Sequence, residues 1–163
     1  MKLFYKITLI TSITIGLLSL SNSANAQCKS YTKKHCLPSL SPYIHNGQLT
    51  SAVLNPGDSA DIELTFNAGK AYRLLVCNQE QIGNAQFKVL DQSRKVIYKS
   101  DPEDANPFWD FKVENTQQLI VQLVIPKMEK SNQRNNLVPN GCVALLVGFK
   151  KSFRLLKAFV TIP

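Results

Sequence analysis

The stretch from Ser59 to Cys77, SADIELTFNAGKAYRLLVC, decides the fold. Apolar and polar residues alternate in both of its halves, which is the pattern of half-buried β-strands. The connection between the halves, Asn67 to Lys70, has glycine in its third position, where a tight turn needs a positive φ. The stretch is therefore predicted to form a β-hairpin that seeds the core with Ile62, Leu64, Phe66, Tyr72, Leu74 and Val76.

Strand signals continue on both sides of this stretch. The sequence NPGD at positions 55–58 predicts a β-turn, because proline presets φ and glycine accepts a left-handed conformation. A second hairpin is expected over 85–99, with Phe87, Val89, Val96 and Tyr98 packing inward. About eight short strands at this spacing predict an all-β protein, an antiparallel two-sheet β-sandwich or jelly roll. The remaining strands are expected at 48–54, 108–114, 119–125 and 141–149, with a polar loop at 127–140.

Residues 1–26 have the features of a signal peptide for export. Lys2 and Lys6 precede an apolar run that reaches about Leu20, and Ala24-Asn25-Ala26 is a small-x-small cleavage site. Cleavage there leaves one domain of ordinary size, which is expected in the periplasm, at the cell surface or outside the cell. The expected organisation is a signal peptide at 1–26, a cysteine-containing arm at 27–46, a β-sandwich at 47–149 and a basic tail at 150–163.

The positive charge of the chain is concentrated at its two ends. The formal net charge is +8, of which the signal peptide carries Lys2 and Lys6. The tail carries four more positive charges, which leaves too little on the body for a broad nucleic-acid-binding face. Helical spacing separates the charges of the tail from its apolar residues. The tail is therefore predicted to be a basic amphipathic helix that docks on the sandwich, on a partner protein or on an anionic membrane. Its docking charges are Lys150, Lys151, Arg154 and Lys157.

Four cysteines follow the export signal, and cysteines in an oxidising compartment are expected to form disulfides. Cys28 and Cys36 lie close together in the arm, which its prolines make too broken for a long helix. Cys77 and Cys142 lie on predicted strands and on the same class of face, so a bridge between neighbouring strands is sterically allowed. Of the three pairings, 28 with 36 and 77 with 142 is therefore favoured.

The sequence lacks the common catalytic motifs. It has no G-x-S-x-G elbow, no glycine-rich phosphate loop and no H-E-x-x-H helix. A carboxylate pair remains as a hydrolase alternative, although acidic residues on turns are usually solvated caps. The candidates for such a pair are Asp91, Asp101, Glu103, Asp104 and Asp110.

Two metal sites are alternatives to simpler interpretations. The loop with Asp101, Glu103 and Asp104 offers the hard oxygens that calcium binds, but a solvated acidic turn is the preferred interpretation. No other cofactor is expected. A zinc site is disfavoured because the spacing matches no common zinc motif and thiols oxidise in this compartment. The zinc ligands would be Cys28, His35, Cys36 and His45.

Phe108, Trp109 and Phe111 form an aromatic concentration. Strand alternation puts Trp109 and Phe111 on one face, and Phe108 and Asp110 on the other. One aromatic pair is expected in the core, and the remaining aromatic is a candidate platform for stacking on a sugar ring. The candidate ligand-binding residues are Phe108, Trp109 and Asp110.

The sequence also resembles known families. Resemblance to an uncharacterised family of small exported proteins of Bacteroidetes-type bacteria extends over 28–150. It is carried by CLPSLSPYIHNGQL (36–49), FNAGKAYRLLVC (66–77), FKVLD (87–91), FWDF (108–111), TQQLIVQLVIP (116–126) and GCVALLVGFK (141–150). The segment at 66–77 is also distantly similar to strands of bacterial pre-peptidase C-terminal domains, which are jelly-roll appendages of secreted enzymes. Neither resemblance covers 152–163.

The leading hypothesis is an exported, non-enzymatic β-sandwich module that acts as a binding or accessory domain in the cell envelope. The alternative is a carbohydrate-binding module, with or without the help of calcium, and the third hypothesis is a small hydrolase. The expected partner is an envelope protein or a glycan rather than a nucleic acid, with peripheral membrane contact through the tail.

Overall fold

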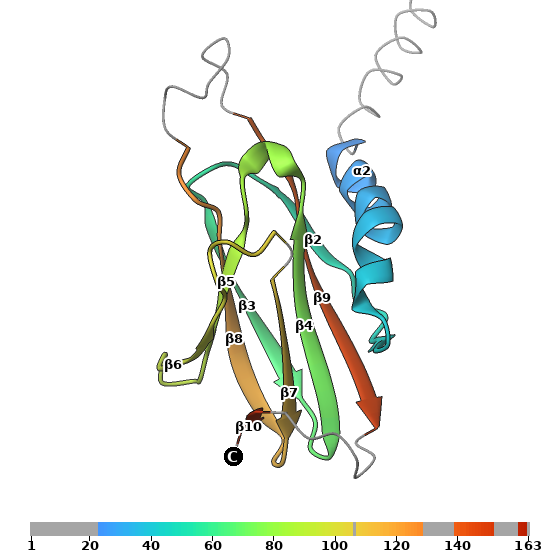
Figure 1. Cartoon of the computed structure of the whole chain (residues 1–163), viewed down its shortest axis with the longest axis vertical. Helices are drawn as coiled ribbons and strands as arrows, with labels where there is room; N and C mark the ends of the chain where they lie inside the picture. Colours follow the sequence, from blue (N-terminus) through green and yellow to red (C-terminus); the bar gives the residue numbers. More distant parts are fainter. Residues whose placement is uncertain (1–22, 106, 129–138, 152–159, 163) are drawn as a thin grey trace, which may run out of the picture.

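A computed structural model describes residues 23–105, 107–128, 139–151 and 160–162 (Figure 1). Its strands form two sheets, called here sheet A and sheet B. The predicted all-β, two-sheet sandwich is confirmed. Sheet A contains β1 (Ile44–His45), β2 (Thr50–Leu54), β4 (Lys70–Asn78), β7 (Phe108–Val113), β9 (Gly141–Lys151) and β10 (Val160–Ile162). Sheet B contains β3 (Ser59–Phe66), β5 (Gln86–Leu90), β6 (Val96–Lys99) and β8 (Gln117–Val124).

The strand order places the longest strands at the centre of sheet A. That order is β1-β9-β4-β7-β10, with β2 also paired to β9, and sheet B has the order β3-β8-β5-β6. The pairs are antiparallel except that β10 runs parallel to β7. Each sheet therefore has one face toward the core between the sheets and one face directed outward, called here its outer face.

The two strands predicted in the stretch Ser59–Cys77 are present, but the prediction that they pair with each other is wrong. β3 pairs with β8, whereas β4 pairs with β7 and β9, so the turn at Asn67–Gly69 carries the chain from sheet B to sheet A. The alternation of apolar residues suits a hairpin and a crossing between sheets equally well, because either arrangement buries one face of each strand. Gly69 has φ +74°, as the turn requires. Phe66 and Tyr72 meet across the core with their rings edge to face, 4.9 Å between centroids.

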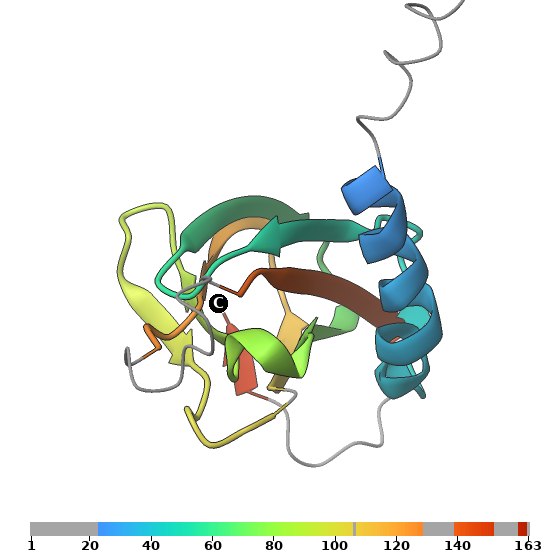
Figure 2. The same ribbon diagram turned by 90° about the horizontal axis from the view of Figure 1, so that it is seen from above.

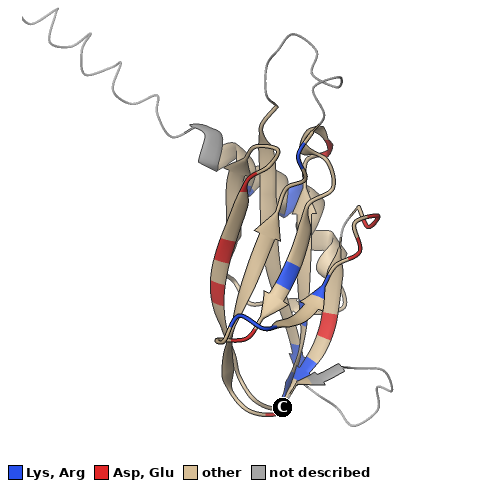
Figure 3. Ribbon diagram, turned by 90° about the vertical axis from the view of Figure 1, so that its left-hand side faces the viewer, with Lys and Arg blue, Asp and Glu red and all other residues tan. Residues whose placement is uncertain are grey.

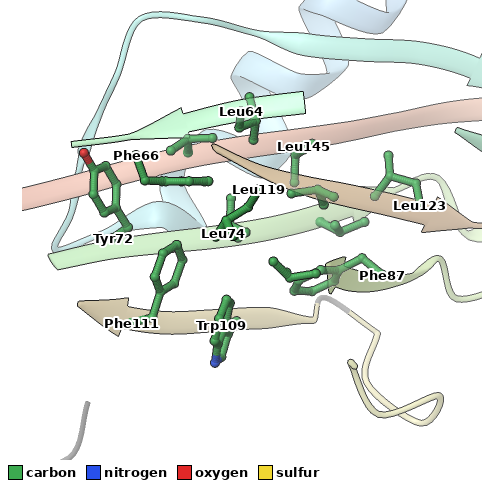
Figure 4. Close-up of a cluster of buried hydrophobic side chains, with 14 of the residues drawn as sticks. Leu64, Phe66, Tyr72, Leu74, Phe87, Trp109, Phe111, Leu119, Leu123 and Leu145 are labelled. Carbon is green, nitrogen blue, oxygen red and sulfur yellow. The ribbon is translucent and has the colours of Figure 1, made fainter. Parts of the chain in front are cut away.

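The core fills the space between the two sheets (Figure 4). Phe66, Leu74, Phe87 and Phe111 are almost completely buried there. Each such side chain contributes about 1.5–3 kcal/mol by leaving water. The predicted inward faces of β3 and β4 are therefore confirmed, and so is the inward packing of Phe87 on β5. Further members of the core are Leu64, Tyr72, Val76, Ile82, Val89, Trp109, Val113, Leu119, Val121, Leu123, Ile125, Val143, Leu145, Val147 and Ile162.

The two turns predicted at 55–58 and at 91–94 are present. Asp58 donates its N–H to the Asn55 carbonyl at 3.0 Å in the NPGD turn. β5 and β6 form the second predicted hairpin, but the register shifts after Val89 so that Val96 pairs with Leu90. This irregularity turns Val96 outward, where it is 50% exposed, so its predicted inward packing is wrong.

The N-terminal arm is helical, which corrects the expectation that its prolines would prevent a long helix. α2 (Ser23–Tyr31) continues into a π-helical turn (Thr32–Cys36) and a 3-10 helix (Leu37–Leu40). Pro38 lies in the first turn of the 3-10 helix, where no backbone N–H is required. The arm lies alongside β2 and β9 (Figure 2). Gly148 permits close packing, because a Cβ there would lie 2.6 Å from the Cβ of Tyr43.

The four cysteines form two disulfides, but the favoured pairing is wrong. Cys28 is bonded to Cys142 and Cys36 to Cys77, with Cα separations of 5.3 and 5.7 Å. Cys28 and Cys36 lie on one helical run, where eight residues span about 12 Å, which is farther than a disulfide reaches. The predicted common face of Cys77 and Cys142 is correct, and the arm lies on that face. Each arm cysteine therefore meets a strand cysteine.

The ends of the tail are strands where a helix was predicted. Lys150 and Lys151 continue β9, opposite Ala71 and Lys70 of β4. Val160–Ile162 forms β10, and Ile162 is buried in the core. The edge of β7 offers unpaired backbone groups, and β10 satisfies them. Arg154 and Lys157 lie outside the described residues.

Other predictions fall partly on residues that the structure does not describe. Of the predicted signal peptide, only Ser23–Ala26 is described, at the start of α2, and the signal peptide stays a prediction. Most of the predicted loop at 127–140 lies outside the described residues. Among the helices of the described segments, none is long and apolar enough to span a membrane.

Candidate functional site

The candidate site is built around Arg73, on the outer face of sheet A. Strand register places Arg73 of β4 directly opposite Asp110 of β7 and, on the other side, Gly148 of β9. The guanidinium and the carboxylate form a bidentate ion pair, with Nε to Oδ1 and Nη2 to Oδ2 both at 2.7 Å. Such pairs fix direction as well as distance, so both side chains are held in one orientation.

Aromatic rings and a second cation surround this ion pair. The Arg73 guanidinium lies 4.7 Å from the ring centroid of Tyr43 and 4.4 Å from that of Phe108. Lys150 Nζ lies 4.4 Å from the Tyr43 centroid. These five residues, Tyr43, Arg73, Phe108, Asp110 and Lys150, are called here the Arg73 cluster. Cation–π contacts of this kind add about 0.5–1 kcal/mol each at exposed sites.

The arm and sheet A jointly build the cluster. Tyr43 follows the 3-10 helix of the arm, and its backbone N–H donates to the Leu40 carbonyl at 3.0 Å. Arg73 Nη1 donates to the carbonyl of Ser41 at 3.2 Å, which ties the sheet to the arm a second time. The cluster therefore depends on the arm being docked, and both disulfides dock it.

Burial and the neighbouring charges shift the pKa values of Tyr43 and Arg73. Burial of the Tyr43 hydroxyl and the negative charge of Asp110 raise the pKa of Tyr43 well above its usual value. The hydroxyl forms no hydrogen bond with another described residue. The hydrogen bonds that Arg73 donates to the Asp110 carboxylate raise the pKa of Arg73. At neutral pH the cluster therefore contains a protonated Tyr43 and a charged Arg73 whose charge Asp110 balances.

The predicted ligand-binding residues do not all lie on the same face of β7. Phe108 and Asp110 lie together in the Arg73 cluster, and Phe108 is 51% exposed. Trp109 is buried in the core, stacked on Phe111 at 4.3 Å and on Tyr98 at 4.8 Å between centroids. Trp109 is therefore wrong as a sugar-stacking candidate, because neighbouring rings cover it. Its alternation with Phe108 on β7 explains the division.

Three of the carboxylates proposed for catalysis are engaged by groups other than a second carboxylate. Asp110 binds a guanidinium rather than a second carboxylate. Asp91 accepts hydrogen bonds from the Ser93 hydroxyl and the Lys95 N–H, and the Ser93 bond lowers the pKa of Asp91. Asp101 accepts from the Glu103 N–H at 2.9 Å. Asp91 and Asp101 are thus turn caps, the usual role of acidic residues on turns.

The predicted metal sites gain no support from the geometry. Within 23–105, 107–128, 139–151 and 160–162, no three acidic, histidine or cysteine side chains converge as metal ligands require. This applies to Asp101, Glu103 and Asp104, the calcium candidates. Cys28 and Cys36 of the zinc alternative are consumed by disulfides, and His35 stacks on the ring of Tyr31 at 4.9 Å.

Sequence reasoning missed Tyr43 and Arg73. Arg73 is the charged residue at an outward position within the otherwise apolar stretch 71–77 of β4, and Asp110 occupies an outward position of β7. An opposite-charge pair of this kind is a signal for cross-strand pairing, but only once β4 and β7 are known to be neighbours. Tyr43 carried no signal, because its role depends on how the arm docks.

Comparison with known proteins identifies no family and finds distant structural likenesses. No protein-family model matches the chain. No curated protein matches it either. One similar solved structure is PliG of Aeromonas hydrophila, a periplasmic lysozyme inhibitor of g-type lysozyme, with 15% identity and a TM-score of 0.44, covering 63% of this chain and 85% of that chain. A designed double-stranded β-helix matches with 14% identity and a TM-score of 0.30, covering 63% of this chain and 99% of that chain.

A third similar structure is the pre-peptidase C-terminal domain of a collagenase from Bacillus anthracis. It shares 13% identity and a TM-score of 0.45 with this chain, covering 61% of this chain and 87% of that chain. The chain is thus distantly similar to a pre-peptidase C-terminal domain, as its sequence indicated. At these levels of similarity no function is transferred.

Proposed function

We propose that the protein is an exported, non-enzymatic β-sandwich module that binds a partner in the cell envelope through the Arg73 cluster. The observation that carries the proposal is Phe108, an aromatic side chain 51% exposed at the start of β7, with the Arg73 guanidinium over its ring. Aromatic residues held in this way supply much of the binding energy at protein interfaces. A ring that is already fixed also loses less conformational entropy on binding.

Export is supported by the two disulfides. Structural disulfides form and persist in oxidising compartments such as the periplasm or the exterior of the cell. Both bonds connect the arm to sheet A, and the arm contributes Tyr43 to the cluster. The environment that oxidises the cysteines therefore also assembles the proposed binding surface.

A protein partner fits the cluster better than a glycan does. Sugar binding by sandwich modules relies on an exposed aromatic platform with free hydrogen-bonding groups beside it. Trp109 is buried, and both carboxylate oxygens of Asp110 already accept from Arg73. Two of the roughly four lone-pair positions of Asp110 are therefore occupied before any sugar hydroxyl binds, whereas an apolar pocket on a protein would accommodate Phe108.

A pull-down with a matched control tests this proposal. The folded protein is immobilised and exposed to solubilised envelope extract of the parent cell, in the wild-type, Phe108→Ser and Val96→Ser forms. Val96 is the control because it is 50% exposed on β6 of the other sheet. We expect one retained protein, lost at least tenfold with Phe108→Ser and unchanged with Val96→Ser, at equal melting temperatures.

Two results would contradict the proposal. Equal retention by all three forms would remove Phe108 from the interface. Retention of no protein, combined with glycan-array binding that Phe108→Ser abolishes, would make the protein a carbohydrate-binding module instead.

A further inference from the structure

Two lysines lie directly opposite each other on the outer face of sheet B. Lys88 of β5 is in register with Lys99 of β6. In the adjoining pair, the Ser100 N–H donates to the Phe87 carbonyl at 2.9 Å. Hydrogen-bonded and non-hydrogen-bonded residue pairs alternate along antiparallel strands, so Lys88 and Lys99 form a non-hydrogen-bonded pair. The side chains of such a pair lie closer together than those of a hydrogen-bonded pair. Like charges in this arrangement destabilise a sheet.

Neither lysine has, within the described part of the chain, a partner that offsets this repulsion. Among the residues that the structure describes, neither side chain forms a hydrogen bond or an ion pair. The register continues from Lys88 to Gln122 of β8 and Asp61 of β3. Asp61 is already bonded to Arg94 at 2.8 Å and to Gln122 at 3.0 Å.

The acidic turn after β6 forms no ion pair with Lys88 or Lys99 among the described residues. Burial is the main cause that raises the pKa of Tyr98, and the negative charges of Asp104 and Asp101 add to it. Tyr98 precedes Lys99 and packs against the core. Asp101 also caps the Glu103 N–H. Positive and negative residues are interspersed over much of the ribbon (Figure 3), so an uncompensated lysine pair is a local feature rather than part of a broad field.

A surface depression lies at this pair. It has a volume of about 130 Å³ and is lined by Gln86, Phe87, Lys88, Lys99 and Val124. Sites for drug-sized ligands have volumes of about 300 Å³ or more, so this one suits a single small group. Two ammonium groups supply charged donors, and the Gln86 amide supplies neutral donors.

We propose that this depression binds an anionic oxygen group, a carboxylate or a phosphate, between Lys88 and Lys99. The anion would remove the repulsion between the ammonium groups and accept a hydrogen bond from each. The site is on sheet B, so it is separate from the Arg73 cluster on sheet A and does not depend on the partner proposed for that cluster.

The test is a titration of the full chain with anions, monitored by the NMR chemical shifts of the backbone amides. Sodium phosphate and sodium acetate are added separately at constant ionic strength, with sodium chloride as the reference salt. We expect saturable shifts at 86–88 and 99–100 with one or both anions and none with chloride. Lys88→Gln or Lys99→Gln should weaken binding at least tenfold. Lys95→Gln, at the exposed turn and outside the depression, should leave binding unchanged.

Thermal melting gives a second readout that does not depend on the shifts. At low salt, Lys99→Gln should raise the melting temperature because it removes the like-charge pair, and added phosphate or acetate should raise that of the wild type but not of the variant. Shifts that stay linear for both anions, or binding that Lys95→Gln weakens as much as Lys99→Gln, would overturn the proposal and leave two ordinary surface lysines. Saturation by phosphate alone identifies a phosphate site, and saturation by acetate alone a carboxylate site.

Discussion

Cys36 and Cys77 are joined by a disulfide whose Cα atoms are 5.7 Å apart, and this bond holds the helical arm over the middle of sheet A. The second bond, Cys28 to Cys142, holds the start of the arm to β9. Both disulfides therefore attach the arm to the sandwich, and neither joins two strands. The Arg73 cluster lies at the place where the attached arm ends.

The two disulfides are expected to stabilise the fold unequally. They close sequence separations of 41 and 114 residues. The chain-entropy account assigns about 4 kcal/mol to the shorter loop and about 5 kcal/mol to the longer. Urea unfolding of the two double serine variants, Cys36→Ser with Cys77→Ser and Cys28→Ser with Cys142→Ser, measures these losses. A non-reducing peptide map that contains a linked 28–36 pair would contradict the connectivity.

Packing of the arm on β9 is testable at Gly148. A Cβ there would lie 2.6 Å from Tyr43 Cβ and 3.0 Å from Leu40 Cγ, so Gly148→Ala should cost about 1–3 kcal/mol. The cost should fall when Leu40→Ala is also present, because the two positions touch. Gly141→Ala is the control, since a Cβ at that position would meet Ile82 and not the arm. A cost of Gly148→Ala below about 0.5 kcal/mol would show that the arm does not pack there.

The sequence showed which face of a strand is apolar, but it did not show which strands pair or which cysteines bond. Alternation correctly assigned Leu64, Leu74 and Val76 to the core and put Trp109 and Phe111 on one face of β7, because a strand shows its faces in its own residues. The pairing of β3 with β8 and not with β4 is a choice between two ways of covering the same face, and alternation is identical for both. The same limit hid the disulfide connectivity, because the helix that separates Cys28 from Cys36 has a weakly amphipathic sequence.

The candidate site was half predictable for the same reason. Phe108 and Asp110 were predicted as ligand-binding candidates together with Trp109, which is buried, whereas Arg73 needed the β4–β7 pairing and Tyr43 needed the docked arm. Residues brought together by tertiary contacts leave no periodic pattern in the sequence. The uncompensated lysine pair on sheet B was hidden in the same way, because neither Lys88 nor Lys99 is unusual by itself.

The C-terminal strand is expected to contribute to stability. Ile162 is 6% exposed in the core, so Ile162→Ala should cost about 2 kcal/mol or more in the free energy of unfolding. Val96→Ala, at a residue that is 50% exposed, should cost less than about 0.5 kcal/mol. Equal, small losses in urea unfolding would mean that β10 is not docked and would restore the tail as a separate docking element.

Alkaline pH should destabilise the protein through Tyr43. Its pKa in the folded protein is raised by burial and by Asp110 above the usual value of about 10, at which the unfolded chain releases the proton. The folded state therefore retains the proton longer, so this contribution to stability is fully present below pH 10 and is lost as pH rises beyond it. Tyr43→Phe keeps the ring under Arg73 but removes the ionisable group.

Urea unfolding at pH 7, 9 and 11 of the wild type and Tyr43→Phe measures this effect. The wild type should lose more stability between pH 9 and pH 11 than the variant, while lysine deprotonation affects both alike. The values at pH 7 serve as the reference, because Tyr43 is protonated there in both folded and unfolded chains. Identical pH profiles would place the Tyr43 hydroxyl in water and away from Asp110, and would remove Tyr43 from the Arg73 cluster.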